Sequence, residues 1–205
     1  MTKLKTIVSF VLIFISLYAF AQNDTSKIPV SIEISNNSTK LPGSGYVGII
    51  NVPIHPGITI GTYKTYSENE KRSIFQTFKL AYFYHHYSHH AFHLYSELGY
   101  KYKVCNNFSV NANIGIGYLH SFADVQSFKL SETGSYEKTG NLGRSQFTGG
   151  GLIGLNYSIP RENKQALTFF INYRFWVQAP FVKEYVLVLP YTTISIGTIV
   201  YLSKK

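Results

Sequence analysis

Several residue types are scarce in this chain, and each scarcity narrows the class of protein. Cysteine, methionine and tryptophan each occur once in 205 residues, so Cys105 has no second cysteine with which to form a disulfide. Past residue 21 there is no apolar run of the roughly 20 residues that a transmembrane helix needs. Any membrane-spanning part must therefore consist of β-strands, because a backbone in lipid has to satisfy its own hydrogen bonds.

The first 21 residues have the pattern of a removable export signal. Lys3 and Lys5 form a basic start, Ile7 to Leu17 form an apolar core, and Ala19-Phe20-Ala21 matches an A-x-A cleavage site. The apolar core has about eleven residues, which is too short to span a bilayer as a helix. We therefore predict a signal peptide over residues 1–21, with a retained membrane anchor as the alternative.

Aromatic residues and glycine are abundant, with 17 tyrosines, 15 phenylalanines and 16 glycines. The stretch from 108 to 118 alternates between two sets of residues. One set is apolar and uncharged (Phe108, Val110, Ala112, Ile114, Ile116 and Tyr118), and the other consists of small polar residues and glycines (Ser109, Asn111, Asn113, Gly115 and Gly117). A period of two over this length predicts a strand with different surroundings on its two faces. Such a strand is typical of a transmembrane barrel, with lipid outside and a polar lumen inside.

The same reasoning predicts eight strands along the chain. They cover residues 45–52, 57–66, 74–86, 91–103, 108–120, 146–158, 166–177 and 191–202. Short connections between strands alternate with the remaining connections, which include the two long loops 121–145 and 178–190. Outer-membrane barrels have this arrangement, with short periplasmic turns and longer outer loops. We predict an all-β fold, an eight-stranded antiparallel up-and-down transmembrane barrel over residues 45–205.

Residues 22–44 are polar, and we interpret them as a periplasmic lead-in to the barrel. Within them, Ile28 to Ile34 also alternates between apolar and polar residues. An additional strand there is the main alternative to the predicted strand count.

The chain resembles the small outer-membrane β-barrel proteins of Gram-negative bacteria. The resemblance rests on the signal segment ending Ala19-Phe20-Ala21, on the alternating strand 108–118 and on the aromatic-rich last strand 191–202. It covers about residues 45 to 203 and is one of architecture, without a catalytic motif. It therefore implies a fold and an outer-membrane location, and it does not imply an activity.

Polar residues on the inward faces of the predicted strands define a candidate site in the lumen. They are Lys79, Glu97, Lys101, Asn111, Asn113, Asn172 and Arg174. Charges in this position have to pair, because an eight-stranded barrel has room only for side chains. We interpret the set as an ion-paired network lined by amides, with a proton or solute path as the alternative.

Five histidines gather around the predicted tip of the hairpin between the third and fourth strands. They are His85, His86, His89, His90 and His93. Imidazoles that approach one another across a hairpin can share a divalent metal. The simpler interpretation is a polar tip with half-exposed histidines and no ligand. No other feature implies a cofactor, and we expect none.

A second resemblance concerns the same hairpin. His86-Tyr87-Ser88 followed by Glu97 resembles the His-x-Ser…Glu arrangement of the outer-membrane lipid A deacylase family. This resemblance implies a general base at His86, a nucleophile at Ser88 and an orienting carboxylate at Glu97. The match departs from the family at His89, where the family has Asn. In addition, roughly 30 Å of strand separates Glu97 from Ser88 at about 3.3 Å per residue.

The chain is basic, with a formal net charge of +9. An exported basic chain favours contact with anionic lipid head groups over nucleic acid. We expect outer-membrane lipid and lipopolysaccharide as surroundings, and loops 121–145 and 178–190 as contacts for an envelope protein. The leading hypothesis is a structural or interaction role, in which outer loops contact a partner, a surface polymer or a metal. The alternatives are a lipid-modifying enzyme of the outer leaflet and a narrow channel or small-ligand binder.

Overall fold

The computed structural model describes most of the chain after residue 26. The described residues are 27–39, 54–85, 89–124, 128–130, 134–138, 140, 142–159, 167–181 and 186–203. Residues 29–201 form one compact unit. Of the second unit, residues 1–28 and 202–205, the structure describes only residues 27–28 at the start of β1 and 202–203 at the end of β10. Within the described ranges, no helix has both the length and the apolar character needed to cross a bilayer.

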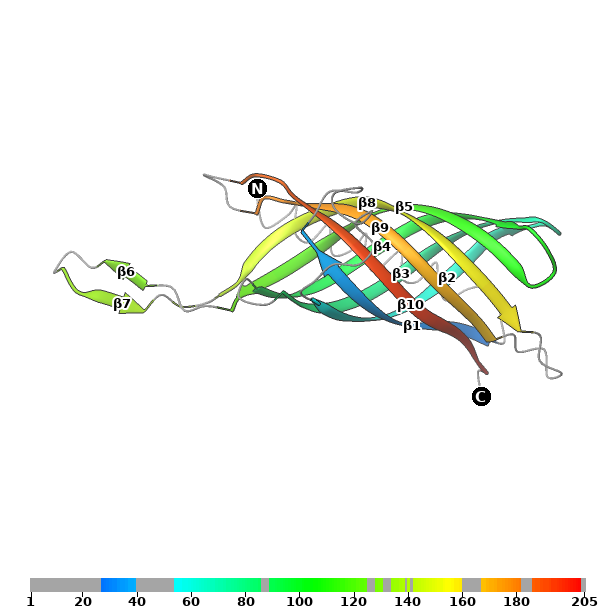
Figure 1. Ribbon diagram of the computed structural model, residues 1–205, viewed down its shortest axis with the longest axis horizontal. Helices are drawn as coiled ribbons and strands as arrows, with labels where there is room; N and C mark the ends of the chain where they lie inside the picture. The colour runs from blue at the N-terminus through cyan, green and yellow to red at the C-terminus, as the bar shows by residue number, and fades with distance from the viewer. Residues whose placement is uncertain are drawn as a thin grey trace, which may run out of the picture. The chain divides into compact units, whose positions relative to one another are not determined.

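Eight strands in the described part of the chain close into an antiparallel barrel (Figure 1). They are β1 (Lys27–Ser38), β2 (Pro56–Glu68), β3 (Arg72–His85), β4 (His89–Lys103), β5 (Phe108–Ala123), β8 (Arg144–Ile159), β9 (Leu167–Ala179) and β10 (Leu189–Ser203). Around the wall the order is β1, β10, β9, β8, β5, β4, β3 and β2. The two short strands β6 (Phe128–Leu130) and β7 (Tyr136–Lys138) form a separate antiparallel pair in the connection between β5 and β8.

The fold class predicted from the alternation is confirmed, since the wall is all-β, antiparallel and closed by eight strands. Seven of the predicted strands correspond to β2, β3, β4, β5, β8, β9 and β10. The register of β3 and β4 illustrates the regularity, because it runs without interruption from Arg72 opposite Tyr102 to His85 opposite His89.

The first wall strand differs from the expectation. Residues 27–38, which we expected to lie in a polar lead-in, form β1, and β1 pairs with β2 from Val30 opposite Thr62 to Asn36 opposite Pro56. The alternation over Ile28–Ile34 is therefore that of the barrel strand that lies between β2 and β10. The predicted strand 45–52 lies outside the described residues.

The two faces of the wall separate as the alternation predicts. Large apolar side chains point outward and are exposed, among them Ile60, Leu80, Leu94, Leu98, Ile114, Ile116, Ile153, Leu155, Ile171 and Ile196. The inward face is buried and mostly polar, and it includes Glu33, Thr77, Lys79, Glu97, Asn111, Asn113, Thr148, Asn156, Asn172 and Ser195. A surface of this kind is the reverse of a water-soluble domain, in which apolar side chains fill the interior. The candidate site therefore lies in the lumen.

Candidate functional site in the barrel lumen

Four charged side chains form a network across the middle of the lumen. Lys79 on β3 makes an ion pair with Glu33 on β1, and its Nζ lies 3.7 Å from Oε2 of Glu97 on β4. Arg174 on β9 makes an ion pair with Glu97, with Nη2 2.5 Å from Oε1. The network contains two cations and two anions, so its formal charges balance. Because Glu97 and Arg174 lie on strands that are not neighbours, the network connects opposite sides of the wall.

Neighbouring side chains complete the coordination of this network. Thr77 Oγ1 donates a hydrogen bond to Glu97 Oε2 at 3.3 Å, and Ser195 Oγ donates one to Glu33 Oε2 at 3.1 Å. The ring of Tyr95 lies against the guanidinium of Arg174, 4.1 Å from ring centroid to Cζ. Buried charges are tolerated only with such partners, since an unpaired ion in this environment costs several kcal/mol.

A chain of asparagine side chains extends from the charged network toward β8. Asn156 Nδ2 donates to Asn111 Oδ1 at 2.8 Å, and Asn111 Nδ2 donates to Asn113 Oδ1 at 2.9 Å. Asn172 also faces this region, and its Oδ1 lies close to the backbone of Gly154 together with Asn111 Oδ1. A methyl group at Gly154 would lie 2.6 Å from Asn111 Oδ1. Glycine at this position therefore leaves the space that the amides occupy.

Lys101 faces the lumen but lies apart from the ion pairs. Its Nζ is 5.5 Å from the ring centroid of Phe75 and 5.8 Å from that of Tyr63. These distances are those of cation–π contacts. Of the predicted lumen set, the structure thus brings Lys79, Glu97 and Arg174 into one network, and it places Lys101 against aromatic rings.

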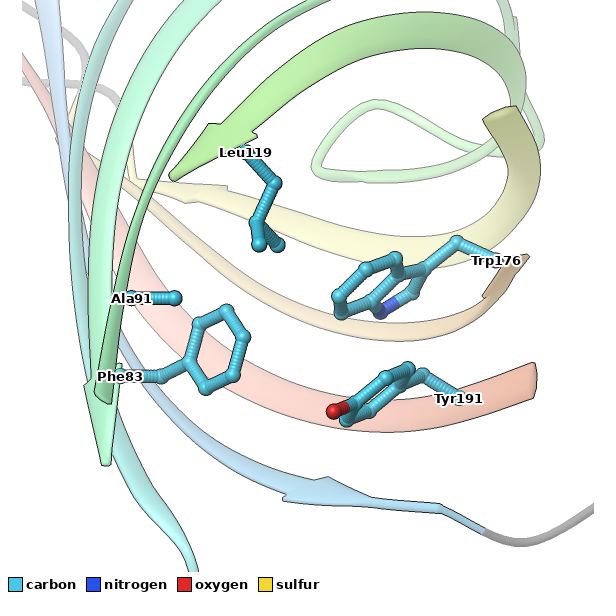
Figure 2. Close-up of a cluster of buried hydrophobic side chains, with 5 residues drawn as sticks. All are labelled: Phe83, Ala91, Leu119, Trp176 and Tyr191. Atoms are coloured by element: carbon cyan, nitrogen blue, oxygen red, sulfur yellow. The ribbon is translucent and has the colours of Figure 1, made fainter. Parts of the chain in front are cut away.

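An aromatic layer fills the lumen on the other side of the charged network. Figure 2 shows Trp176 and Tyr191 lying one above the other, with Phe83, Ala91 and Leu119 around the same space. The rings of Trp176 and Tyr191 are 4.3 Å apart at 9° between planes. His93 also stacks on Trp176, with ring centroids 5.1 Å apart. Tyr191 and Leu119 are fully buried, which shows how tightly this layer packs.

Among the described residues, small cavities lie between these groups, and two of them border the charged network. One, of about 50 Å³, is lined by residues of the asparagine chain and by Lys79, Lys101 and Glu33. The other, of about 20 Å³, lies between the charged network and Trp176. A cavity needs roughly 10–15 Å³ to hold one water molecule. Both cavities therefore accept individual waters, and neither accepts a sugar or an amino acid.

The predicted histidine cluster is divided between the faces of the wall. His93 is buried in the lumen, where its Nε2 lies 2.8 Å from Thr148 Oγ1. His85 and His89 stack at 5.8 Å, and His85 also stacks on His55 at 3.7 Å. His90 lies on the exterior, with Nδ1 3.3 Å from the hydroxyl of Tyr82. His86 lies outside the described residues. Among the described residues, no three His, Cys, Asp or Glu side chains are arranged to hold a metal ion.

The residues that resemble a deacylase motif are only partly described. His86 and Ser88 lie outside the described residues, whereas Glu97 is 4% exposed in the lumen. Both of its carboxylate oxygens are engaged, one by Arg174 and the other by Thr77 and Lys79. In this structure Glu97 therefore orients lumen cations.

Sequence reasoning missed three important residues of the lumen site. Glu33 was missed because it lies in the segment that we expected to be a lead-in. Tyr95 and Asn156 have inward parity on β4 and β8, but parity alone did not show that they contact Arg174 and Asn111. Trp176 has inward parity on β9, but its stacking on Tyr191 and His93 depends on strands that are distant in sequence.

Comparison with known proteins supports the fold. No protein-family model matches the chain, and no curated protein matches it. Among solved structures, Neisserial surface protein A matches with a TM-score of 0.51 at 9% identity, over 88% of this chain and 98% of that one. The outer membrane enzyme PagL and the attachment invasion locus protein Ail of Yersinia pestis match with TM-scores of 0.43, at 11% and 16% identity, over 86% of this chain and 99% and 97% of theirs. The chain therefore has the fold of the small outer-membrane β-barrel proteins.

Proposed function

We propose that this protein is an outer-membrane barrel with a structural or interaction role, exerted by the connections at the outer ends of its strands. The observation that carries this proposal is the filled lumen. Paired charges, an asparagine chain and an aromatic layer occupy it, and the two cavities described between them have room only for water molecules. Because the interior of the barrel is filled, its function has to be carried out by its surfaces.

The outer-membrane location rests on the exterior of the barrel. Ile114 and Ile116 are 70% and 76% exposed, and an apolar belt of this kind is stable only against lipid or detergent. Tyrosines such as Tyr82 and Tyr118 stand toward one end of the belt, and Tyr100 and Tyr102 toward the other, as in the aromatic girdles of transmembrane barrels. Lipopolysaccharide would then surround the outer end.

The connection between β5 and β8 is the strongest candidate for an interaction surface. It contains the strand pair β6 and β7, which gives part of a long loop its own hydrogen-bonded structure. Tyr136 on β7 is 76% exposed, and tyrosine is enriched at binding surfaces because it offers a large contact area. The apolar segment near Leu187, which is 62% exposed, is a second candidate surface for an envelope protein.

Site-specific photo-crosslinking in living Gram-negative cells tests the proposal. A benzophenone amino acid replaces Tyr136 in one variant and Val104, 57% exposed in the turn between β4 and β5, in a matched control. We expect defined adducts with lipopolysaccharide, a surface polymer or an envelope protein at position 136, and a different set at position 104. Identical patterns at both positions would contradict an interaction role at the outer loops. Passage of a small sugar such as arabinose through the barrel in proteoliposomes would also contradict it, because the lumen would then be open.

A further inference from the structure

A hydroxyl–imidazole cluster lies on the exterior of the barrel, where β5 and β8 approach their outer ends. Tyr118 and His120 come from β5, and Ser145 on β8 is directly opposite His120 in the strand register. Tyr118 OH lies 2.8 Å from Ser145 Oγ and 3.1 Å from His120 Nδ1. Ser145 Oγ lies 3.5 Å from His120 Nδ1. The three groups form a closed triangle of polar contacts on the exterior of the wall.

The backbone of the β5–β8 connection determines which nitrogen of His120 can act as a base. His120 Nε2 lies 3.2 Å from the carbonyl oxygen of Leu142, which can only accept, so Nε2 carries the hydrogen. Nδ1 of the neutral ring is then a lone-pair acceptor that faces the two hydroxyls. Gly143, with φ of +73°, makes this possible, because a side chain there would overlap Nε2 of His120.

We propose that Ser145, His120 and Tyr118 form a serine esterase site that cleaves carboxylic esters of membrane lipids. Ser145 is the nucleophile, His120 Nδ1 is the general base, and the carbonyl of Leu142 orients the imidazole. The Tyr118 hydroxyl, within hydrogen-bond distance of the nucleophile, donates to the oxyanion that forms on the substrate carbonyl. The Ser145–His120 distance is long for a hydrogen bond, as is common before a substrate binds.

The reaction balances with water as the second reactant. Ser145 Oγ bonds to the ester carbonyl carbon while His120 Nδ1 takes the hydroxyl proton. The bond from that carbon to the alcohol oxygen then breaks, and the alcohol leaves with the proton from Nδ1. Water attacks the acyl-serine, His120 takes its proton and returns it to Ser145 Oγ, and the fatty acid leaves.

The surroundings of Ser145 favour a lipid ester as the substrate. Phe147 follows on the same exterior face and is 74% exposed. Beyond it, Gly149 and Gly151 lie opposite Ile116 and Ile114. A Cβ added at these glycines would come no closer to other atoms than 3.9 and 3.4 Å, respectively. An acyl chain can lie on this strip of β8 with its ester at Ser145. This substrate assignment rests on the proposed membrane location, whereas the serine chemistry does not.

Covalent labelling tests the serine chemistry without a membrane. The full chain, folded in detergent micelles, is treated with a fluorophosphonate probe, and the modified residue is identified by mass spectrometry. We expect the label on Ser145, its loss in Ser145→Ala, and at least a tenfold slower reaction in His120→Ala. The matched control is Ser96→Ala, which removes an outward serine held by Gln76 Nε2 at 2.8 Å, and labelling should be unchanged. No label, or equal labelling in Ser145→Ala, overturns the proposal.

Hydrolysis of p-nitrophenyl esters in the same micelles tests catalysis and the acyl strip. We expect hydrolysis of the laurate ester, and at least a tenfold lower kcat in Tyr118→Phe with little change in KM. Gly149→Leu should slow the laurate ester several-fold and leave the acetate ester unchanged. Equal loss on both esters would contradict the acyl strip. If the protein is neither labelled nor active but still shows loop crosslinks, the esterase proposal is wrong and the interaction role is unaffected.

Discussion

Glu97 is the residue on which the lumen cations depend most. It contacts both Arg174 and Lys79, and it is 4% exposed. Glu97→Gln removes the negative charge but keeps the shape, so Arg174 remains buried without a full counter-charge. Breaking a buried pair from one side costs about 3–5 kcal/mol. We expect a loss of this size in the free energy of unfolding, measured by urea titration of the barrel in lipid vesicles.

Two controls accompany this prediction. Glu68→Gln changes an exposed carboxylate of the same type at the end of β2, and it should cost less than about 1 kcal/mol. The double variant Glu97→Gln, Arg174→Met removes both charges and should recover part of the loss. If the single variant at Glu97 is as stable as the one at Glu68, the ion network does not stabilise the lumen.

Glycine at position 154 is required by the asparagine chain. A methyl group there would overlap Asn172 Oδ1 and lie 2.6 Å from Asn111 Oδ1. Gly154→Ala should therefore destabilise the barrel by about 1–3 kcal/mol, since overpacking forces neighbours out of position. Gly149→Ala on the same strand is the control, because its new Cβ would meet only Gly115 O at 3.9 Å. Equal unfolding midpoints for the two variants in the same urea titration would show that the amides rearrange without cost.

At the scale of elements, alternation predicted seven wall strands, and for the eighth, β1, it was outweighed by the polar composition around it. In β5 the apolar and polar sets separate completely, so its faces could be assigned from the residues alone. In β1 the alternation over Ile28–Ile34 lies between the polar segments 23–27 and 36–39, and this composition suggested a connection. Missing β1 also removed Glu33 from the predicted site.

Partner choice in the lumen could not be predicted for a different reason. Parity told which residues point inward, but Glu97 meets Arg174 from a strand on the far side of the wall. That contact depends on barrel closure and stagger, which local patterns do not encode. The same limit applies to His120 and Ser145, whose strands are joined by a long connection.

The position of β1 in the wall can be tested by disulfide formation. Ile32 on β1 lies directly opposite Ile60 on β2, at the separation of cross-strand neighbours. In a Cys105→Ser background, Ile32→Cys with Ile60→Cys should cross-link on mild oxidation of the folded protein, seen as a shift on a non-reducing gel. Ile32→Cys with Ile153→Cys on β8 should not cross-link. Failure of the first pair, with folding intact, would mean that another segment pairs with β2.

At the scale of the whole molecule, the single tryptophan reports which face of the wall meets lipid. Trp176 lies in the lumen and is 3% exposed. Lipids brominated on their acyl chains quench a tryptophan only on contact. Fluorescence of the folded protein should therefore hardly change between brominated and ordinary phosphatidylcholine vesicles. Trp176→Phe with Ile116→Trp, which moves the fluorophore to a site 76% exposed on the exterior, should be quenched at least twofold.

A third variant separates contact with lipid from exposure to water. Trp176→Phe with Leu142→Trp places the fluorophore at an 89% exposed position in the β5–β8 connection. It should be quenched by aqueous acrylamide and much less by brominated lipid, because loops of a membrane barrel extend into water or head groups. The fluorophore at 116 should respond in the opposite order. If position 116 responds to acrylamide as strongly as position 142, the apolar belt faces water or another protein, and the membrane location is wrong.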